Sequence, residues 1–142
     1  VIDQKNKIKN SDKSQPSLKE DSVFQRKIAA LEIELKALEY TELRTLAAVS
    51  VGKAPGPESS LLKIRGTEMQ QHLDELFMEA AGYFSLPYVP GQYSLESNPD
   101  NHVGFDADSV SSLVYFNNRK ASIYGGSNEI QKNIIAKHVL GL

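Results

Sequence analysis

The sequence predicts an all-α protein, a four-helix up-down bundle with a disordered N-terminal lead-in. Apolar residues recur at three- and four-residue steps, which is the spacing of one helical face. Glycine and proline clusters interrupt these patterns, and the strict alternation typical of strands is absent. With 142 residues, 40% of them hydrophobic, the chain can form one compact domain. We therefore expect a flexible linker over residues 1–18 and a single helical domain over residues 19–142.

The lead-in and the first helix differ sharply in composition. Residues 1–18 are mostly Lys, Asn, Asp, Gln and Ser, too polar to offset the entropy lost on ordering. The helix that follows should end at Gly52, because glycine suits the left-handed position after a helix and Pro55 cannot continue the hydrogen-bond ladder. Its predicted apolar face comprises Phe24, Ile28, Leu31, Leu35, Leu38, Leu46 and Val49.

Three further helices are expected. The second runs from Pro57 to about Gly82 and should pack antiparallel to the first. A long irregular segment, rich in proline and glycine, separates Leu86 from Asp106. A third helix spans Ala107 to about Ser122, and a fourth follows Gly125-Gly126. The residues expected to be buried are Leu62, Met69, Leu73, Leu76, Phe77 and Ala80 in the second helix, and Val110, Leu113, Val114 and Phe116 in the third.

Composition argues against several classes of function. The chain has no cysteine, and the scattered His72, His102 and His138 have no ligand spacing, so no metal site is predicted. A net charge of −2 offers no overall field for nucleic acid or an anionic membrane. No apolar run approaches the roughly 20 residues that cross a bilayer, and the polar start lacks a signal-peptide segment. The prediction is a soluble, cytoplasmic protein.

The segment around Gly125-Gly126 has the composition of an anion-binding helix start. Two glycines allow positive φ or a close backbone approach, and Ser127 or Asn128 can cap the next helix. Asn128 with Gln131 would form a capping box. The N–H groups and the positive dipole end of a helix suit a phosphate. From local chemistry alone, an ordinary structural turn is the better explanation of these residues.

Residues 124–131, which read YGGSNEIQ, resemble the closing signature of the acyl-CoA dehydrogenase family, in its bacterial branch. The similarity extends over roughly residues 20–142. It implies the C-terminal helical domain of an FAD-dependent enzyme that carries out the α,β-dehydrogenation of acyl-CoA thioesters. In such enzymes a carboxylate removes the α proton and flavin N5 accepts the β hydride. The resemblance further implies that Ser127, Asn128 and Glu129 line the flavin diphosphate, while Tyr124, Gly125 and Gly126 form the turn beside the acyl thioester.

The sequence departs from the family pattern in two places. Gly125 occupies the position that holds the catalytic glutamate in many relatives, so no catalytic residue is assigned to this chain. The base could lie on an earlier helix, in a missing part or a partner subunit, and Glu129, about one turn further on, is a poor substitute. Residues 78–82, MEAAG, stand where many relatives show Gln-x-x-Gly-Gly. The upstream residues and β domain that grip the flavin have no counterpart, so we expect the isolated chain to be inactive and to bind FAD weakly or not at all.

The resemblance also implies partners. These are an acyl-CoA substrate, a homo- or hetero-oligomer of acyl-CoA dehydrogenase subunits, and electron-transfer flavoprotein as electron acceptor. Two alternatives stay open: a non-catalytic assembly subunit of the same fold, and an acyl-CoA oxidase that passes electrons to oxygen.

Other polar and aromatic residues have structural explanations. Arg119 and Lys120 are interpreted as the cationic end of the third helix. A solvated face or an intersubunit contact accounts for Lys63, Arg65 and Glu68. The aromatic residues Tyr83, Phe84, Tyr88 and Tyr93 are expected to pack over the end of the bundle.

Overall fold

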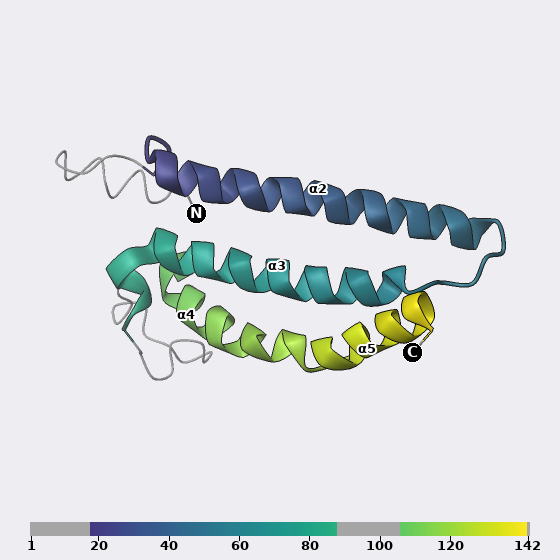
Figure 1. Ribbon diagram of the computed structural model, residues 1–142. Helices are drawn as coiled ribbons and strands as arrows, with labels where there is room; N and C mark the ends of the chain where they lie inside the picture. Colours follow the sequence, from purple (N-terminus) through teal and green to yellow (C-terminus); the bar gives the residue numbers. More distant parts are fainter. Residues whose placement is uncertain (1–17, 88–105, 142) are drawn as a thin grey trace. The chain divides into compact units, whose positions relative to one another are not determined.

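A computed structural model describes residues 18–87 and 106–141 of the chain, and within these ranges all regular structure is helical. Figure 1 shows the four α-helices in chain order. They are α2 (Ser22–Ser50), α3 (Glu58–Ala81), α4 (Asp106–Asn118) and α5 (Asn128–Leu140), with short 3₁₀ helices η1 (Gly82–Ser85) and η3 (Arg119–Ser122) after α3 and α4. The predicted all-α, four-helix fold is confirmed.

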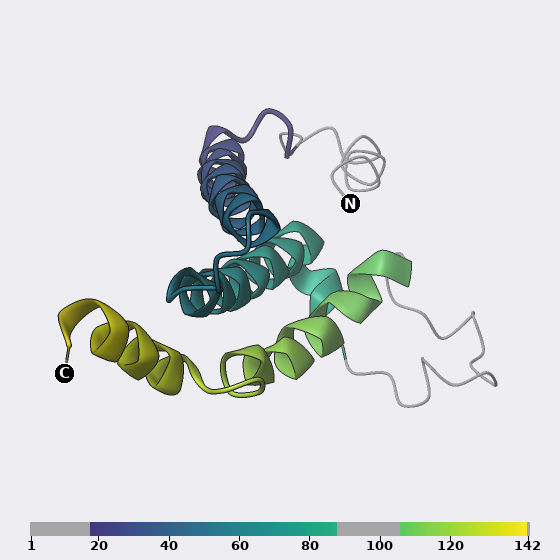
Figure 2. The ribbon, with the colours of Figure 1, turned by 90° about the vertical axis from the view of Figure 1, so that its right-hand side faces the viewer.

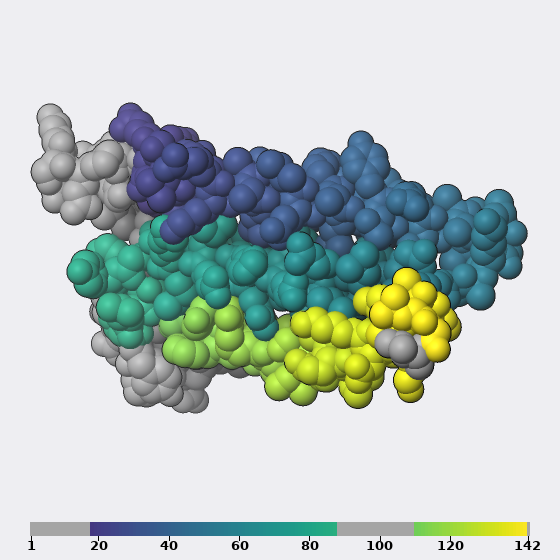
Figure 3. All heavy atoms as spheres, in the orientation of Figure 1, coloured from purple at the N-terminus to yellow at the C-terminus, as the bar shows by residue number. Residues whose placement is uncertain are grey.

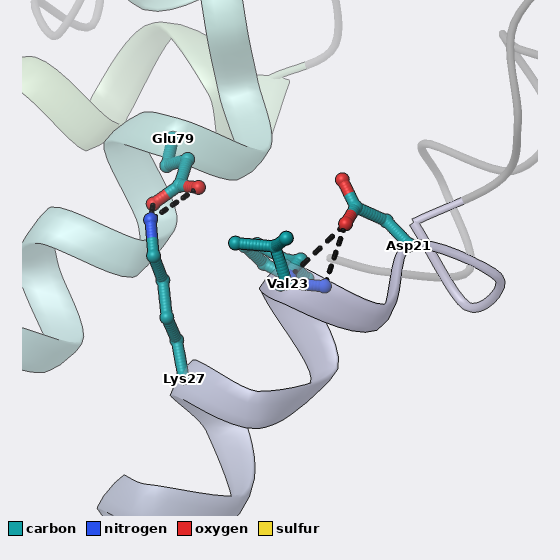
Figure 4. A network of polar contacts seen from close by, with 5 residues as sticks. Asp21, Val23, Lys27 and Glu79 are labelled. Carbon is teal, nitrogen blue, oxygen red and sulfur yellow. Dashed lines mark hydrogen bonds and ion pairs between the residues drawn. The ribbon is translucent and has the colours of Figure 1, made fainter.

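The ends of α2 are set by local hydrogen bonds. Asp21 precedes the helix, and its Oδ1 accepts from the backbone N–H groups of Val23 at 2.9 Å and Phe24 at 3.2 Å (Figure 4). At the other end Gly52 has φ +82°, as the sequence predicts. Its N–H donates to the Val49 carbonyl and that of Lys53 to the Ala48 carbonyl, the pair of bonds that defines a Schellman cap.

The chain divides into two compact units, and both α2 and α3 run through the division. Unit 1 comprises Val1–Ile28 and Leu73–Asn118. Its core is built from Leu18, Phe24 and Ala80, with Ile28 and Leu76 packed against them. Lys27 of α2 pairs with Glu79 of α3 at 2.8 Å (Figure 4). Both side chains are exposed, so the apolar cluster and not the ion pair accounts for most of the stability here.

Unit 2 comprises Ala29–His72 and Arg119–Leu142. Within it the greater part of α2 runs antiparallel to the first half of α3, as predicted for two helices joined by a short connection (Figures 1 and 2). Ile64 of α3 and Ala121 of η3 are buried. In the space-filling view the atoms of α5 border those of the first half of α3 (Figure 3), and the two helices are joined where Asn128 accepts from Lys63 and Thr67. Arg119 donates to the Gln71 carbonyl at 3.2 Å, and the Gln71 amide donates back to the Arg119 carbonyl at 3.3 Å.

The predicted buried faces are only partly right. Phe24 and Ala80 are buried, but Val110, Leu113, Val114 and Phe116 are exposed in α4, Phe116 by 68%. In α2 the predicted face is exposed at Leu35, Leu46 and Val49, with Leu46 at 57%. Helical spacing places such residues on one face, but burial requires a second surface to cover that face. In the described part of the chain no such surface covers these side chains.

Some predictions lie outside the described residues. These are the conformation of residues 1–17, most of the irregular segment (88–105), and the placement of Tyr88, Tyr93 and His102. Leu18, the last residue of the predicted lead-in, is buried against Phe24. The other two aromatic residues that were expected to pack over the end of the bundle are exposed, Tyr83 by 88% and Phe84 by 37%. No helix in the described ranges combines the length and the apolarity needed to cross a bilayer.

Candidate functional site

The candidate site is the five-residue turn over 123–127, which joins η3 to α5 within unit 2. Gly125 and Gly126 adopt φ values of +68° and +86°, a left-handed conformation that costs other residues energy. The Gln131 side chain reaches back from α5 and donates to the Gly125 carbonyl at 3.1 Å. A Cβ added at Gly126 would lie 2.6 Å from that same amide nitrogen. The backbone conformation of the turn therefore favours both glycines, and a side chain at Gly126 would also displace the Gln131 amide.

The first turn of α5 is capped by Ser127. Ser127 has an extended backbone, and its Oγ accepts from the Ile130 N–H at 3.4 Å. Of the two caps that the sequence allowed, the structure uses this one. The predicted capping box between Asn128 and Gln131 is wrong, because Gln131 bonds the Gly125 carbonyl and Asn128 points to other partners.

Asn128 faces inward, and only 8% of it is exposed. Its Oδ1 accepts from Lys63 Nζ at 2.8 Å and, more weakly, from Thr67 Oγ1 at 3.4 Å. Lys63 also donates to the Ser122 carbonyl at 3.2 Å. Lys63 and Thr67 lie four residues apart on α3, so they share one helical face. Their role was missed from the sequence, where Lys63 was assigned to a solvated face or a contact between subunits.

Glu129 is exposed at the first turn of α5, and its carboxylate is held in the ionised form. The hydrogen bond from its own backbone N–H lowers the pKa of Glu129 below the ordinary carboxyl value, and the Ser127 hydroxyl acts in the same direction. The charges of Lys132 and Lys63 contribute less. A carboxylate with a lowered pKa is a poor proton acceptor. Glu129 therefore has the chemistry of a capping residue.

Five of the six residues singled out from the sequence line one accessible turn. Tyr124 is 58% exposed, Gly125, Gly126 and Glu129 are exposed, and Ser127 is half-buried. Asn128 is the exception, because it holds the turn from behind. Arg119 and Lys120 belong to the preceding 3₁₀ helix, η3. Arg119 donates a hydrogen bond to the Gln71 carbonyl of α3, which gives it a structural role.

Three other features of the described residues provide no catalytic site: a small cavity, the His, Asp and Glu side chains, and the MEAAG segment. A cavity of about 180 Å³ lies between α2 and α3 in unit 2, lined by Glu34, Ala37, Leu38, Thr41, Leu61, Arg65 and Met69. Pockets that bind drug-sized ligands have volumes of about 300–1,000 Å³, so this cavity is too small for a flavin. Across residues 18–87 and 106–141, His, Asp and Glu form no group of three placed to hold a metal ion. In the MEAAG segment, Ala80 and Ala81 are buried and Glu79 is paired with Lys27.

Comparison with known proteins identifies relatives of the chain. Residues 7–140 match the family model described as acyl-CoA dehydrogenase, C-terminal domain. The chain is 30% identical over 109 residues to the acyl-CoA dehydrogenase IpdE1 of Mycobacterium tuberculosis, an alignment that covers 72% of this chain and 24% of that protein. It is 30% identical over 100 residues to IpdE1 of Mycolicibacterium smegmatis, covering 70% of this chain and 22% of the relative. The chain thus spans about a quarter of the length of these curated relatives. No solved structure matches it significantly.

Proposed function

Because the chain belongs to the acyl-CoA dehydrogenase family through its C-terminal domain, we propose that it contributes flavin contacts and subunit contacts to an FAD-dependent acyl-CoA dehydrogenase. The observation that carries this proposal is the exposed, capped tip of α5, formed by the YGGSNEIQ segment. Family membership supports the kind of enzyme, and the geometry of the tip supports the specific role.

The residues of the tip fit a diphosphate. A helix N-terminus presents backbone N–H groups and a partial positive charge, which together favour phosphate oxygens. Ser127 fixes the first turn of α5, and Lys63 and Lys132 place two ammonium groups close enough to act on Glu129. In this proposal Ser127, Asn128 and Glu129 form the wall beside the diphosphate, with Asn128 acting through the position of the turn.

The exposed turn would lie beside the acyl thioester. The left-handed Gly125 leaves its backbone open, since nothing lies within 4 Å of a Cβ added there, whereas the Gln131 amide lies beside Gly126. When bound, FAD supplies an acceptor for the β hydride of the acyl-CoA. This chain supplies no carboxylate at Gly125 to remove the α proton. The proposed enzyme therefore takes its base from an upstream helix or from a partner subunit.

Assembly with other subunits is supported by the exposed face of α2. Leu43 is 54% exposed, Leu46 57% and Val49 42%, all in the part of α2 that belongs to unit 2. Exposed apolar residues at helical spacing are typical of a surface that another chain covers. The proposed partners are further acyl-CoA dehydrogenase subunits, identical or different, with acyl-CoA as substrate, electron-transfer flavoprotein as electron acceptor and the cytoplasm as location.

A second candidate function is a non-catalytic assembly subunit, which the absence of a base at Gly125 favours. One experiment separates the two: the chain is combined with the remainder of its reading frame, or with a neighbouring paralogue, and acyl-CoA-dependent bleaching of flavin is measured. Bleaching that falls on Ser127→Ala and Glu129→Gln substitution supports the enzymatic role. Undiminished bleaching with both substitutions, or with the chain omitted, supports the assembly role.

The isolated chain is proposed to be inactive and to retain little flavin. Incubation with FAD followed by dialysis tests this directly. Visible flavin absorbance that persists in a stoichiometric amount would contradict it.

A further inference from the structure

A single ammonium group connects the two ends of the YGGSNEIQ turn. Ser122 is the last residue of η3 and Asn128 is the first residue of α5, so they flank the turn over 123–127. Lys63 Nζ donates to the Ser122 carbonyl at 3.2 Å and to Asn128 Oδ1 at 2.8 Å. The group thus fixes where the chain enters the turn and where α5 starts, both relative to the same point on α3.

The surroundings make this connection strong. Asn128 is buried, and Lys63, Thr67 and Ser122 are each half-buried. Hydrogen bonds to a charged donor are about twice as strong as neutral ones, and exclusion of water strengthens them further. Thr67 adds a second, weaker bond to the same oxygen. By contrast, the turn's own side-chain bond, from Gln131 to the Gly125 carbonyl, connects α5 only to the middle of the turn.

We propose that Lys63 is a positioning residue for the flavin site: it holds the turn and the first residue of α5 on α3, so that the tip of α5 is already oriented before FAD binds. This inference rests on the proposed function. The ammonium group also contributes positive charge on the protein side of the tip, where its field reaches Glu129. Without Lys63, the turn keeps its glycines and its Ser127 cap but loses the two stronger bonds that place it on α3, leaving the 3.4 Å contact from Thr67.

The test uses the complete enzyme, in which this chain is joined to the remainder of its reading frame. Lys63→Met removes the charge and both bonds at similar side-chain length, and Lys63→Arg keeps a cationic donor. Lys36→Met is the matched control in the same unit, where Lys36 pairs with the exposed Glu39. We expect the FAD dissociation constant of the apoenzyme to rise about tenfold or more in Lys63→Met, as for loss of a charged hydrogen bond. Lys63→Arg should recover most of the affinity, and Lys36→Met should match the wild type.

Amide hydrogen exchange over residues 123–130, measured in the flavin-free enzyme, tests the position of the turn separately. Exchange should speed up in Lys63→Met and in Asn128→Ala, and the double variant should show little further change, because both remove the same bond. A purely structural role would lower the thermal midpoint of Lys63→Met and leave the FAD dissociation constant, measured well below that midpoint, unchanged. That result overturns the inference. Equal exchange in Lys63→Met and Lys36→Met also overturns it.

The proposed function fails in a different way. The tip is not part of the flavin site if two results are found together. The double variant Ser127→Ala/Glu129→Gln binds FAD as tightly as the wild type does, and bound FAD slows hydrogen exchange at no amide over residues 127–130. The exchange comparison in the flavin-free enzyme then still reports whether Lys63 holds the turn. If FAD does protect those amides and Lys63→Met binds FAD as the wild type does, only the positioning role of Lys63 is refuted.

Discussion

Asn128 provides a quantitative test of how the signature turn is held. Replacement by alanine removes the acceptor that Lys63 Nζ reaches at 2.8 Å. A hydrogen bond to a charged group contributes about 1.5–3 kcal/mol net, and the 3.4 Å contact from Thr67 adds little. Alanine in a helix gains roughly half a kcal/mol over asparagine. The expected net loss in the free energy of unfolding is therefore about 1–2 kcal/mol.

The matched control is Asn133→Ala, the same substitution on the exposed surface of α5. It carries the gain in helix propensity without the loss of the bond, so the two variants should differ by about 2 kcal/mol. A third variant, Asn128→Asp, keeps an acceptor for Lys63 and adds a negative charge at the helix start, so its stability should equal or exceed that of the wild type. Urea unfolding followed by circular dichroism measures all three. Equal midpoints and slopes for Asn128→Ala and Asn133→Ala would refute the reasoning.

Three further predictions follow from the geometry. Gly125→Ala should lower stability by about 1 kcal/mol, because the φ of +68° is left-handed and the space around it is open; calorimetry that shows no loss would exclude a strained position. The pKa of Glu129 is lower in the folded chain than in the unfolded one. Its contribution to the free energy of unfolding is therefore fully present above the unfolded-state pKa of about 4.3, and it is lost as the pH falls through the folded-state pKa. The protection of the amides at the start of α5, corrected for the intrinsic pH dependence of exchange, should thus fall as the pH drops below the ordinary carboxyl range in the wild type and not in Glu129→Gln. Leu43→Glu, on the exposed face of α2, should leave the helix content unchanged and reduce the sedimentation coefficient of the complete enzyme; an unchanged coefficient would place the interface elsewhere.

The helix order and most helix boundaries were predictable because they depend on local chemistry. Gly52 ends α2 with the left-handed cap expected of it, and Pro57 directly precedes the start of α3 at Glu58. The glycine pair before α5 adopts the positive φ that the sequence allowed. Each of these outcomes is decided within a few residues of the position concerned.

Burial and long-range hydrogen bonds were harder to predict, because they depend on what lies opposite. Phe116 belongs to an apolar stripe, yet it is 68% exposed, since helical spacing does not show whether a second surface covers a face. The partners Lys63 and Asn128 are 65 residues apart in sequence, and nothing near either residue identifies the other. The choice of Ser127 over Asn128 as the cap follows from that same contact, since the side chain of Asn128 is already engaged.

The central claim is that the tip of α5 contacts the diphosphate of FAD, and hydrogen exchange in the complete enzyme tests it most directly. Peptides that cover residues 127–131 are compared with and without bound FAD, and peptides from α4 serve as the internal reference. The account predicts slower exchange at the start of α5 on binding FAD, with a smaller effect when Ser127 is replaced by alanine. Slower exchange elsewhere in the enzyme, with no change at residues 127–131, would contradict it.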